Sequence, residues 1–514
     1  MKPFACFLIA FLFSFHQLFA VEYYVDSKNG KDNNNGTSIQ KPLQSLQAVN
    51  ALRLLPGDKV LFRRGTFYYG QLRISCEGNP GNIILISSYG KGDMPVINGG
   101  GMYEEGVIVY NSEQLTIENI EVTNKGKERK PGRKGVHILL SDYGIAHNIR
   151  INNLYIHDVN GSNIKKQGGG AGIHWTNKGS KIKSAFDSLL IEHCRIERTD
   201  RNGIISSGYW SRKDWFPSLH VIIRYNYLND IGGDGIVPMG CDGALIEHNT
   251  LYRAGQRFPE GDAAAGIWPW SCDNTIIQYN EVACTSGPWD SQGFDSDWNC
   301  DNTIIQYNYS HDNIGGFLLV CNDGSVGYPN SIGNIGTIVR YNLSINDGGR
   351  TTGIHAEFSP SIHITGPVYN TKVYNNVVYI MQRKSKKTDS TLIEMGNWNG
   401  YADSTLIANN IFYVEETADY QMAKSTRNFY QSNLYYGRHI NKPQTTGEII
   451  SNPGFKSLPP KGLNGFDKLK CFMLQKNSLC RQAGEPIVDS AIKDFFGNTV
   501  WPGLRPAIGV HQLE

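Results

Sequence analysis

Two aspartates, Asp295 and Asp297, carry the clearest capacity for chemistry, in the segment QGFDSDW. If this segment is a β-strand, both side chains leave one face and their Cα atoms lie roughly 6.6 Å apart. Two carboxyl groups so placed can cleave a glycosidic bond, because one protonates the leaving oxygen while the other activates water. Like charges this close also raise one pKa, which suits the acid. The pair predicts a site for glycoside hydrolysis, and the spacing favours inversion.

Aromatic side chains gather in the same part of the chain. Seven of the nine tryptophans lie between Trp175 and Trp298, and flat indole faces can stack on sugar rings. Trp268 and Trp270 precede the aspartates by 27 residues each, and we expect them to be sugar platforms. Trp210 is a further candidate for sugar binding.

An exact repeat indicates which element carries these residues. CDNTIIQYN occurs at 272–280 and again at 300–308, and degenerate copies surround it at intervals of 23 to 34 residues. Each copy is a short apolar strand, an asparagine turn and a second short strand, with no helix-length periodicity between them. A period of this size is typical of a solenoid. We therefore expect stacked coils of a parallel β-helix, with the repeated asparagine forming an internal amide ladder.

A recurrent Gly-Ile or Gly-Phe pair predicts the register of one outer sheet, with the residue after glycine pointing inward and the next one outward. Glu357 then lies two coils beyond the aspartates and Asp234 two coils before them, and both are candidate catalytic acids. Asp262 and Asp290 lie in loops that precede the same sheet, and the sequence leaves open whether they take part in catalysis. The glycines are Gly172, Gly203, Gly235, Gly266, Gly293, Gly316 and Gly353. The outward residues two positions later are His174, Ile205, Val237, Trp268, Asp295, Leu318 and His355, and those four positions later are Thr176, Ser207, Met239, Trp270, Asp297, Val320 and Glu357.

Four further polar residues are candidate substrate ligands. His174 and His355 face the predicted cleft, where either could bind a sugar or orient a carboxylate. His311 leaves a neighbouring strand and could reach over the cleft, and Arg350 could clamp an acidic sugar. No ligand spacing for zinc is present, so we expect no metal and no cofactor, with calcium entering only if the enzyme is a lyase.

Composition and the amino terminus restrict the class of protein. The chain has 514 residues, 40% hydrophobic and 19% charged, with a net charge of +2, which excludes a disordered chain and a polybasic nucleic-acid binder. Residues 1–20 read as a secretory signal peptide, so we expect a secreted or periplasmic protein without a membrane span after its removal. Cys471 and Cys480 are a candidate disulfide, whereas four cysteines recurring in successive coils are expected to form a reduced, inward-facing stack: Cys241, Cys272, Cys300 and Cys321.

These residues resemble the right-handed parallel β-helix family of exported, pectate-lyase-like carbohydrate-active enzymes. The amino-terminal segment 23–68 is similar to that family's first strand, capping helix and first coil, with the helix near 43–54, and the tail DFFGNTVWPGLRPAIGVHQLE is similar too. The stretch 292–321 resembles glycoside hydrolase family 141. The Gly-Asp-Asp and Gly-His-Gly motifs of polygalacturonases and the pectate lyase Asp-His signature are absent from the sequence.

The sequence thus predicts an all-β fold, a single right-handed parallel β-helix solenoid with a short N-terminal capping helix. Its parts are a signal peptide (1–20), first coils (21–100), a β-helix with the cleft (101–440) and a C-terminal cap (441–514). The predicted function is an exported glycoside hydrolase that cleaves a plant- or algal-type polysaccharide, acting as a monomer without a nucleic-acid partner. A polysaccharide lyase or epimerase acting on uronic acids and a non-catalytic carbohydrate-binding solenoid are the alternatives.

Overall fold

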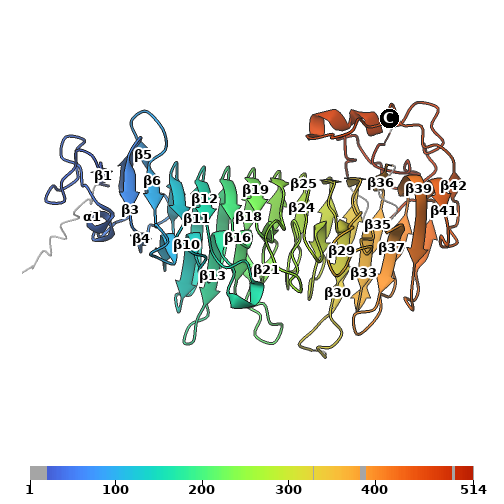
Figure 1. The fold of residues 1–514 in the computed structure, drawn as a ribbon, viewed down its shortest axis with the longest axis horizontal. Coiled ribbons are helices and arrows are strands. Elements are labelled where there is room, and N and C mark those ends of the chain that lie inside the picture. The colour runs from blue at the N-terminus through green and yellow to red at the C-terminus, as the bar shows by residue number, and fades with distance from the viewer. Residues whose placement is uncertain (1–19, 328, 382–388, 489–491, 513–514) are drawn as a thin grey trace, which may run out of the picture.

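The computed structural model describes residues 20–327, 329–381, 389–488 and 492–512. It is an elongated parallel β-helix whose coils follow one another from the N-terminal to the C-terminal end (Figure 1). The predicted signal peptide lies, up to residue 19, outside the described residues. Among the described residues, no helix is both long and apolar enough to cross a bilayer.

Parallel strands form three long sheets, here called A, B and C, and β39 runs on from sheet B into sheet C. Sheet A contains, in order, β1 (Glu22–Val25), β2 (Lys59–Arg63), β5 (Ile84–Tyr89), β8 (Leu115–Glu118), β11 (Ile145–Asn152), β14 (Ala185–Glu192), β18 (Ile222–Arg224), β22 (Leu245–Glu247), β24 (Ile276–Gln278), β27 (Ile304–Gln306), β31 (Ile338–Arg340), β35 (Lys372–Tyr374), β38 (Leu406–Ala408) and β40 (Phe429–Gln431). Short strands beside it are β17 (Ser218–Leu219), β21 (Cys241–Asp242), β30 (Asn334–Ile335) and β34 (Val368–Tyr369).

Sheets B and C complete each coil. Sheet B contains β3 (Phe67–Tyr69), β6 (Val96–Asn98), β9 (Glu121–Asn124), β12 (Tyr155–Val159), β15 (Arg195–Thr199), β19 (Tyr227–Ile231), β23 (Thr250–Tyr252), β25 (Glu281–Ala283), β28 (Tyr309–His311), β32 (Leu343–Ile345), β36 (Val377–Ile380), β39 (Ile411–Gln421), β41 (Leu434–His439) and β42 (Ile449–Ile450). Sheet C contains β4 (Leu72–Ile74), β7 (Glu105–Tyr110), β10 (Lys134–Ser141), β13 (Ala171–Lys178), β16 (Asn202–Ser207), β20 (Ile236–Val237), β26 (Gln292–Ser296), β29 (Gly316–Cys321), β33 (Ile362–Thr365) and β37 (Thr391–Gly396).

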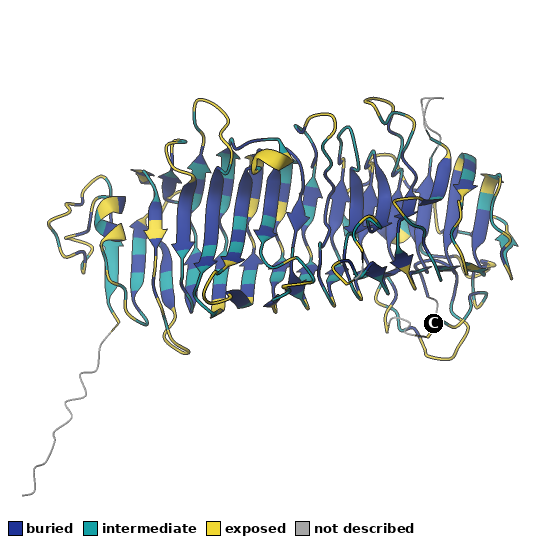
Figure 2. Cartoon of the chain, turned by 90° about the horizontal axis from the view of Figure 1, so that it is seen from below, coloured by how far each residue is buried: buried dark blue, intermediate teal, exposed yellow. Residues whose placement is uncertain are grey.

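The repeat forms strands because its apolar residues stack on their counterparts in the next coil. Ile277 pairs with Ile305 and both are fully buried, in a core that runs the length of the solenoid (Figure 2). The predicted asparagine ladder is present at the turn that follows. Asn280 Nδ2 donates to Asn308 Oδ1 at 3.0 Å, and the same bond recurs through Asn226, Asn249, Asn280, Asn308, Asn342, Asn376, Asn410 and Asn433.

The predicted register of sheet C is confirmed as far as Asp297 and is wrong in the last two copies. Gly316, with φ at 124°, pairs with Gln292 rather than with Gly293, so the row shifts by one residue there. The inward row is Ile173, Ile204, Ile236, Ile267, Phe294, Leu318, Ile362 and Ile393. The first outer row is His174, Ile205, Val237, Trp268, Asp295, Leu319, His363 and Glu394, and the second outer row is Thr176, Ser207, Met239, Trp270, Asp297, Cys321, Thr365 and Gly396.

Segments outside the coils cover the N-terminal end and one face of the solenoid. At the N-terminal end lies α1 (Leu46–Asn50), which is shorter than predicted, with the Ser45 hydroxyl capping it by accepting the Ala48 N–H. Near the C-terminal end the segments 451–488 and 492–512 pack an apolar cluster against the outer face of sheet B, and the first of them includes a 3₁₀ helix (Phe466–Phe472) (Figure 1).

The cysteines differ in part from expectation. All nine in the described residues are free, so the predicted disulfide between Cys471 and Cys480 is wrong. Cys241 and Cys272 stack as predicted, with the Cys241 N–H donating to the Cys272 sulfur at 3.3 Å. Cys321 instead lies in the second outer row, because the register shifts by one residue at Gly316.

Candidate active site

A cavity of about 570 Å³ opens on the outer face of sheet C, where β26, β29, β33 and β37 lie side by side. Its volume is within the range of pockets that hold small ligands. Strand residues form its floor, and loop residues form its walls. The lining residues are Lys165, Ala263, Trp270, Trp289, Asp290, Asp297, Trp298, Leu319, Cys321, Phe358, His363, Thr365, Glu394, Gly396, Asn397 and Trp398.

Two carboxyl groups line this cavity near β26, those of Asp290 and Asp297. Burial and the neighbouring Asp297 charge raise the pKa of Asp290 to about 7. Burial also raises the pKa of Asp297, although its Oδ1 accepts the Trp298 N–H at 2.6 Å and the Cys321 thiol at 3.0 Å. These two donors favour the ionised form of Asp297. The environment thus separates one carboxyl group that keeps its proton from one that loses it more readily.

Asp295 belongs to the same acidic cluster but lies behind the cavity. It is 2% exposed and is not a lining residue. Burial, and then the charges of Asp290, Asp297 and Asp234, raise its pKa well above the usual value. Its Oδ1 has no hydrogen-bond partner among the described residues. The cluster that the sequence predicted is therefore present, with Asp290 rather than Asp295 facing the cavity.

The backbone at Asp290 is held in an unusual conformation. Asp290 and Ser291 both have positive φ, 53° and 68°, which is uncommon for residues with side chains. Beneath them the buried Arg350 guanidinium donates to the carbonyl oxygens of Asp290 and Pro288. Arg350 is 2% exposed, so the prediction that it clamps an acidic sugar is wrong. It instead holds the loop that presents Asp290 to the cavity.

Asp234 occupies its predicted register position but is enclosed by protein. It is 1% exposed, and its carboxylate pairs with the Arg201 guanidinium at 3.1 Å. Its Oδ1 accepts the Trp268 indole N–H at 3.1 Å and the Ala265 N–H at 3.1 Å. Trp268 is itself 3% exposed, which contradicts its predicted role as a sugar platform. The three side chains form a buried support beside the acidic cluster.

One cation reaches the cavity from a loop that the sequence did not indicate. Lys165 lies in a 3₁₀ turn (Lys165–Gln167) that leads into β13, four coils earlier in the chain than β26. Its Nζ lies 5.3 Å from the Trp268 ring centre and 5.9 Å from that of Trp270. Its backbone N–H donates to Asp262 Oδ2 at 2.8 Å, which fixes the turn against a second loop. The Lys165 charge lowers the pKa of Asp290 and Asp297 against the effect of burial.

A group of tryptophans forms one wall of the cavity. Trp270 and Trp298 line it with ring centres 5.7 Å apart, and the Nε1 atom of each has no hydrogen-bond partner among the described residues. Trp210, whose residue is 43% exposed, lies 5.7 Å from Trp270 and 6.4 Å from Trp298. The predicted sugar-binding roles of Trp270 and Trp210 therefore remain predictions that their positions favour.

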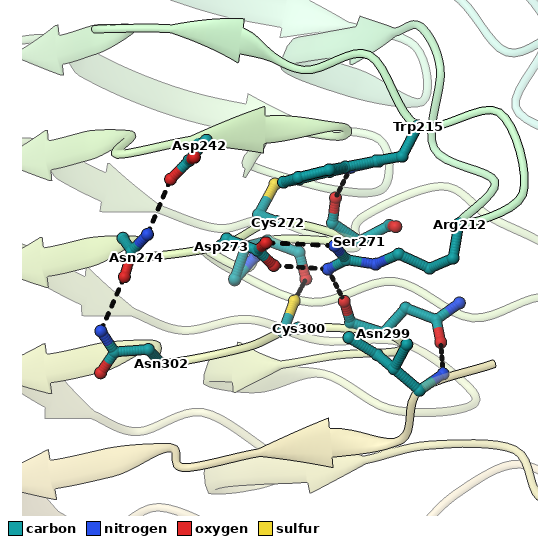
Figure 3. Close-up of polar contacts among 12 residues, drawn as sticks. Arg212, Trp215, Asp242, Ser271, Cys272, Asp273, Asn274, Asn299, Cys300 and Asn302 are labelled. Atoms are coloured by element: carbon teal, nitrogen blue, oxygen red, sulfur yellow. Dashed lines mark hydrogen bonds and ion pairs between the residues drawn. The ribbon is translucent and has the colours of Figure 1, made fainter. Parts of the chain in front are cut away.

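The loop that carries Trp210 is anchored by Arg212 (Figure 3). The Arg212 guanidinium pairs with Asp273 at 2.6 Å, donates to the Asn299 carbonyl and lies 4.3 Å from the ring centre of Trp215. Trp215 in turn donates to the Ser271 carbonyl at 3.3 Å. Arg212 thus connects the loop to two successive coils.

We predict that Arg212→Ala raises KM by roughly 5- to 10-fold while leaving kcat within a factor of about 2, because Trp210 loses its fixed place against the tryptophan wall. Loss of the charged hydrogen bonds also lowers the free energy of unfolding by roughly 1.5–3 kcal/mol. Steady-state kinetics and urea unfolding measure both. Lys213→Ala changes an exposed neighbour in the same loop and serves as the control. A lower stability with an unchanged KM would show that the loop does not shape the site.

The other predicted ligands lie in different places. Glu357 lies in an exposed turn with φ at 69°, since 346–361 is an insertion and not a strand. His355 lies outside the outer row, with its ring centre 3.7 Å from that of the lining residue Trp289 and the two rings tilted by 38°. His311 belongs to sheet B and contacts Glu281 and Asp312, so it does not reach the cleft.

His174 holds its predicted place in the first outer row but lies four coils from Asp295. Its Nε2 contacts the Ser207 hydroxyl at 2.9 Å, its ring stacks on that of His137 at 5.3 Å, and it does not line the cavity. Sequence reasoning also missed several lining residues. The register shift hid those of β33 and β37, among them His363 and Glu394, and distance along the chain hid Lys165.

Comparisons with known proteins agree with this architecture. The family model for the right-handed β-helix region matches residues 96–271. A lacto-N-biosidase of Bifidobacterium longum subsp. longum is 28% identical over 83% of this chain, and the chain spans only 31% of that protein. The crystal structure of a family 136 (GH136) lacto-N-biosidase from Eubacterium ramulus is 27% identical, covers 76% of this chain and 68% of its own, and superposes with a TM-score of 0.60.

The predicted right-handed parallel β-helix is therefore correct, whereas the comparisons do not support the resemblance to family 141. Neither relative is named for a plant or algal polysaccharide. The chain is a right-handed parallel β-helix protein, similar over most of its length to glycoside hydrolases of the lacto-N-biosidase kind.

Proposed function

We propose that the chain is an exported glycoside hydrolase that releases lacto-N-biose units from an oligosaccharide. The observation that carries the proposal is the pair Asp290 and Asp297 in one cavity, with the pKa of one raised to about 7. The similarity to two lacto-N-biosidases supports the substrate class. Export rests on the predicted signal peptide, and the substrate replaces the plant- or algal-type polysaccharide expected from the sequence.

Asp290 serves as the general acid in this proposal. Its raised pKa keeps the proton near neutral pH, and that proton passes to the glycosidic oxygen as the bond from this oxygen to the anomeric carbon breaks. Arg350 supports the step by fixing the loop from below. Because the acid must be protonated, we expect the rate to fall as the pH rises above about 7.

Asp297 serves as the ionised partner. Two donors, the Trp298 N–H and the Cys321 thiol, stabilise its negative charge beside the positive charge that develops on the sugar. Attack by Asp297 on the anomeric carbon retains the anomeric configuration, whereas activation of a water by Asp297 inverts it. Trp270 and Trp298 offer flat faces for the sugar rings.

The test is turnover of an aryl lacto-N-bioside by the purified mature protein. We expect release of the aryl alcohol together with free lacto-N-biose, and ¹H NMR of the fresh product reads its anomeric form. Absorbance near 235 nm is followed in parallel on uronic acid polysaccharides. An absorbance rise there without hydrolysis would identify a lyase, and binding without turnover would identify the non-catalytic solenoid; either result would overturn the proposal.

A further inference from the structure

The cavity has a second polar end, away from the acids. The outer rows pass from Asp295 and Asp297, through Leu319 and Cys321, to four residues of β33 and β37. At about 4.8 Å for each coil, this end lies roughly 10–14 Å from the acids, beyond the reach of a single sugar ring. The four residues are His363, Thr365, Glu394 and Gly396, and all line the cavity.

Three polar atoms converge above Gly396. A β-carbon built on Gly396 would lie 3.0 Å from Thr365 Oγ1, 3.2 Å from His363 Nε2 and 3.4 Å from Glu394 Oε1. The absence of a side chain thus leaves a small recess with a hydroxyl, an imidazole nitrogen and a carboxyl oxygen around it. Such a set can both donate to and accept from one hydroxyl group of a ligand.

The surroundings of the recess favour a ligand without charge. Burial lowers the pKa of His363 to about 4, so its ring is neutral, and burial raises the pKa of Glu394 to about 7, with the Asp389 charge as a second cause. The only Lys or Arg among the described lining residues is Lys165, which lies against Trp268 and Trp270 at the acidic end. Phe358 and Trp398 add aromatic surface at the polar end.

We propose that this end is a separate sugar subsite, which binds an uncharged sugar unit by seating one of its hydroxyl groups in the recess over Gly396. The inference builds on the proposed function, since it concerns the same cavity, but it is a statement about binding. It makes the enzyme selective for a neutral oligosaccharide long enough to span both ends. Glu394 and the nearby Asp389 disfavour an acidic sugar there.

The test is a binding measurement on the full mature chain. The parent is the Asp290→Asn variant, which blocks turnover, and the probe is the tetrasaccharide that joins lacto-N-biose to lactose. Gly396→Ala fills the recess without straining the backbone, because Gly396 is not among the residues with positive φ. We expect calorimetry to show at least a roughly 10-fold weaker Kd, from the lost hydrogen bonds.

Two further variants keep the result interpretable. Gly327→Ala adds the same methyl group at an exposed glycine with open space and should leave Kd unchanged, whereas Glu394→Ala should weaken binding as Gly396→Ala does. A sialylated form of the tetrasaccharide should bind more weakly than the neutral one. An unchanged Kd in Gly396→Ala, or no binding by the parent, would overturn the subsite. If the wild type does not hydrolyse the tetrasaccharide, but Gly396→Ala still weakens its binding, the proposed function is overturned and the subsite is not.

Discussion

Asp290→Asn and Asp297→Asn should each lower kcat for an aryl lacto-N-bioside by roughly 10³-fold or more, because each removes one of the two carboxyl groups that line the cavity near β26. The amide keeps the size of the side chain but can neither give up the proton of the acid nor carry the charge of its partner. KM should change much less, since neither substitution alters the tryptophan wall. Initial rates at pH 6, where Asp290 keeps its proton, measure the effect.

Asp295→Asn is the matched control for these two variants. It makes the same change in the same acidic cluster, at a side chain that is 2% exposed and does not line the cavity. We expect it to keep activity within about 10-fold of the wild type, since it acts on the reaction only through its neighbours. A loss as large as that of Asp290→Asn would identify Asp295 as the acid, as the strand spacing alone had predicted, and would overturn the assignment to Asp290.

A second readout separates loss of chemistry from loss of fold. The pKa of Asp290 is raised to about 7 in the folded protein, against roughly 3.9 in an unfolded chain. Its contribution to stability is therefore full below about pH 4 and is lost as the pH rises to about 7. Above pH 7 the wild type bears the free-energy cost of a buried, ionised Asp290 carboxylate, and Asp290→Asn removes this cost. The Tm of the variant relative to the wild type should therefore be higher at pH 8 than at pH 4.5. An inactive variant that also unfolds at lower temperature at pH 8 would point to misfolding.

The β-helix could be predicted from the sequence because each coil repeats the same pattern of apolar and turn residues. An apolar residue such as Ile277 and an asparagine such as Asn280 recur from coil to coil, and stacking places the equivalent residues of successive coils in contact. The same periodicity predicted the outward row correctly as far as Asp295 and Asp297. A register derived from repeats holds only while the repeated glycine occupies the same position in its strand, and Gly316 does not, because it pairs with Gln292 instead of Gly293.

The site was predicted less well, because its walls come from positions where the repeat is broken. At Gly316 the strand begins one residue earlier relative to its neighbour, and at 346–361 an insertion replaces the expected strand. The resulting shift hid His363 and Glu394. Asp290 stands before its strand in a positive-φ conformation that no composition rule indicates. Lys165 comes from a distant coil, so only the folded chain shows its approach to the cavity.

The asparagine ladder leads to the largest effect expected on stability. The Asn280 side chain is fully buried; its amide donates to the Ile246 carbonyl at 2.9 Å and to Asn308 Oδ1 at 3.0 Å, and its Oδ1 accepts the Asn249 N–H at 2.9 Å. Asn280→Ala leaves these partners buried without a replacement, and each such group costs about 1–3 kcal/mol. We expect the free energy of unfolding to fall by roughly 3–6 kcal/mol.

Gln278→Ala tests whether the inward position, rather than the amide itself, causes that effect. Gln278 belongs to the same repeat, two residues earlier, but it is partly exposed and its amide donates outside the core to Glu247 at 2.8 Å. Water can replace that bond, so the loss should stay below about 1 kcal/mol. Urea unfolding of both variants, followed by far-UV circular dichroism, gives the comparison. If both variants lose the same free energy of unfolding, the buried asparagine ladder stabilises the coil no more than an exposed row of amides does. The internal hydrogen bonds would then have no advantage over hydrogen bonds to water.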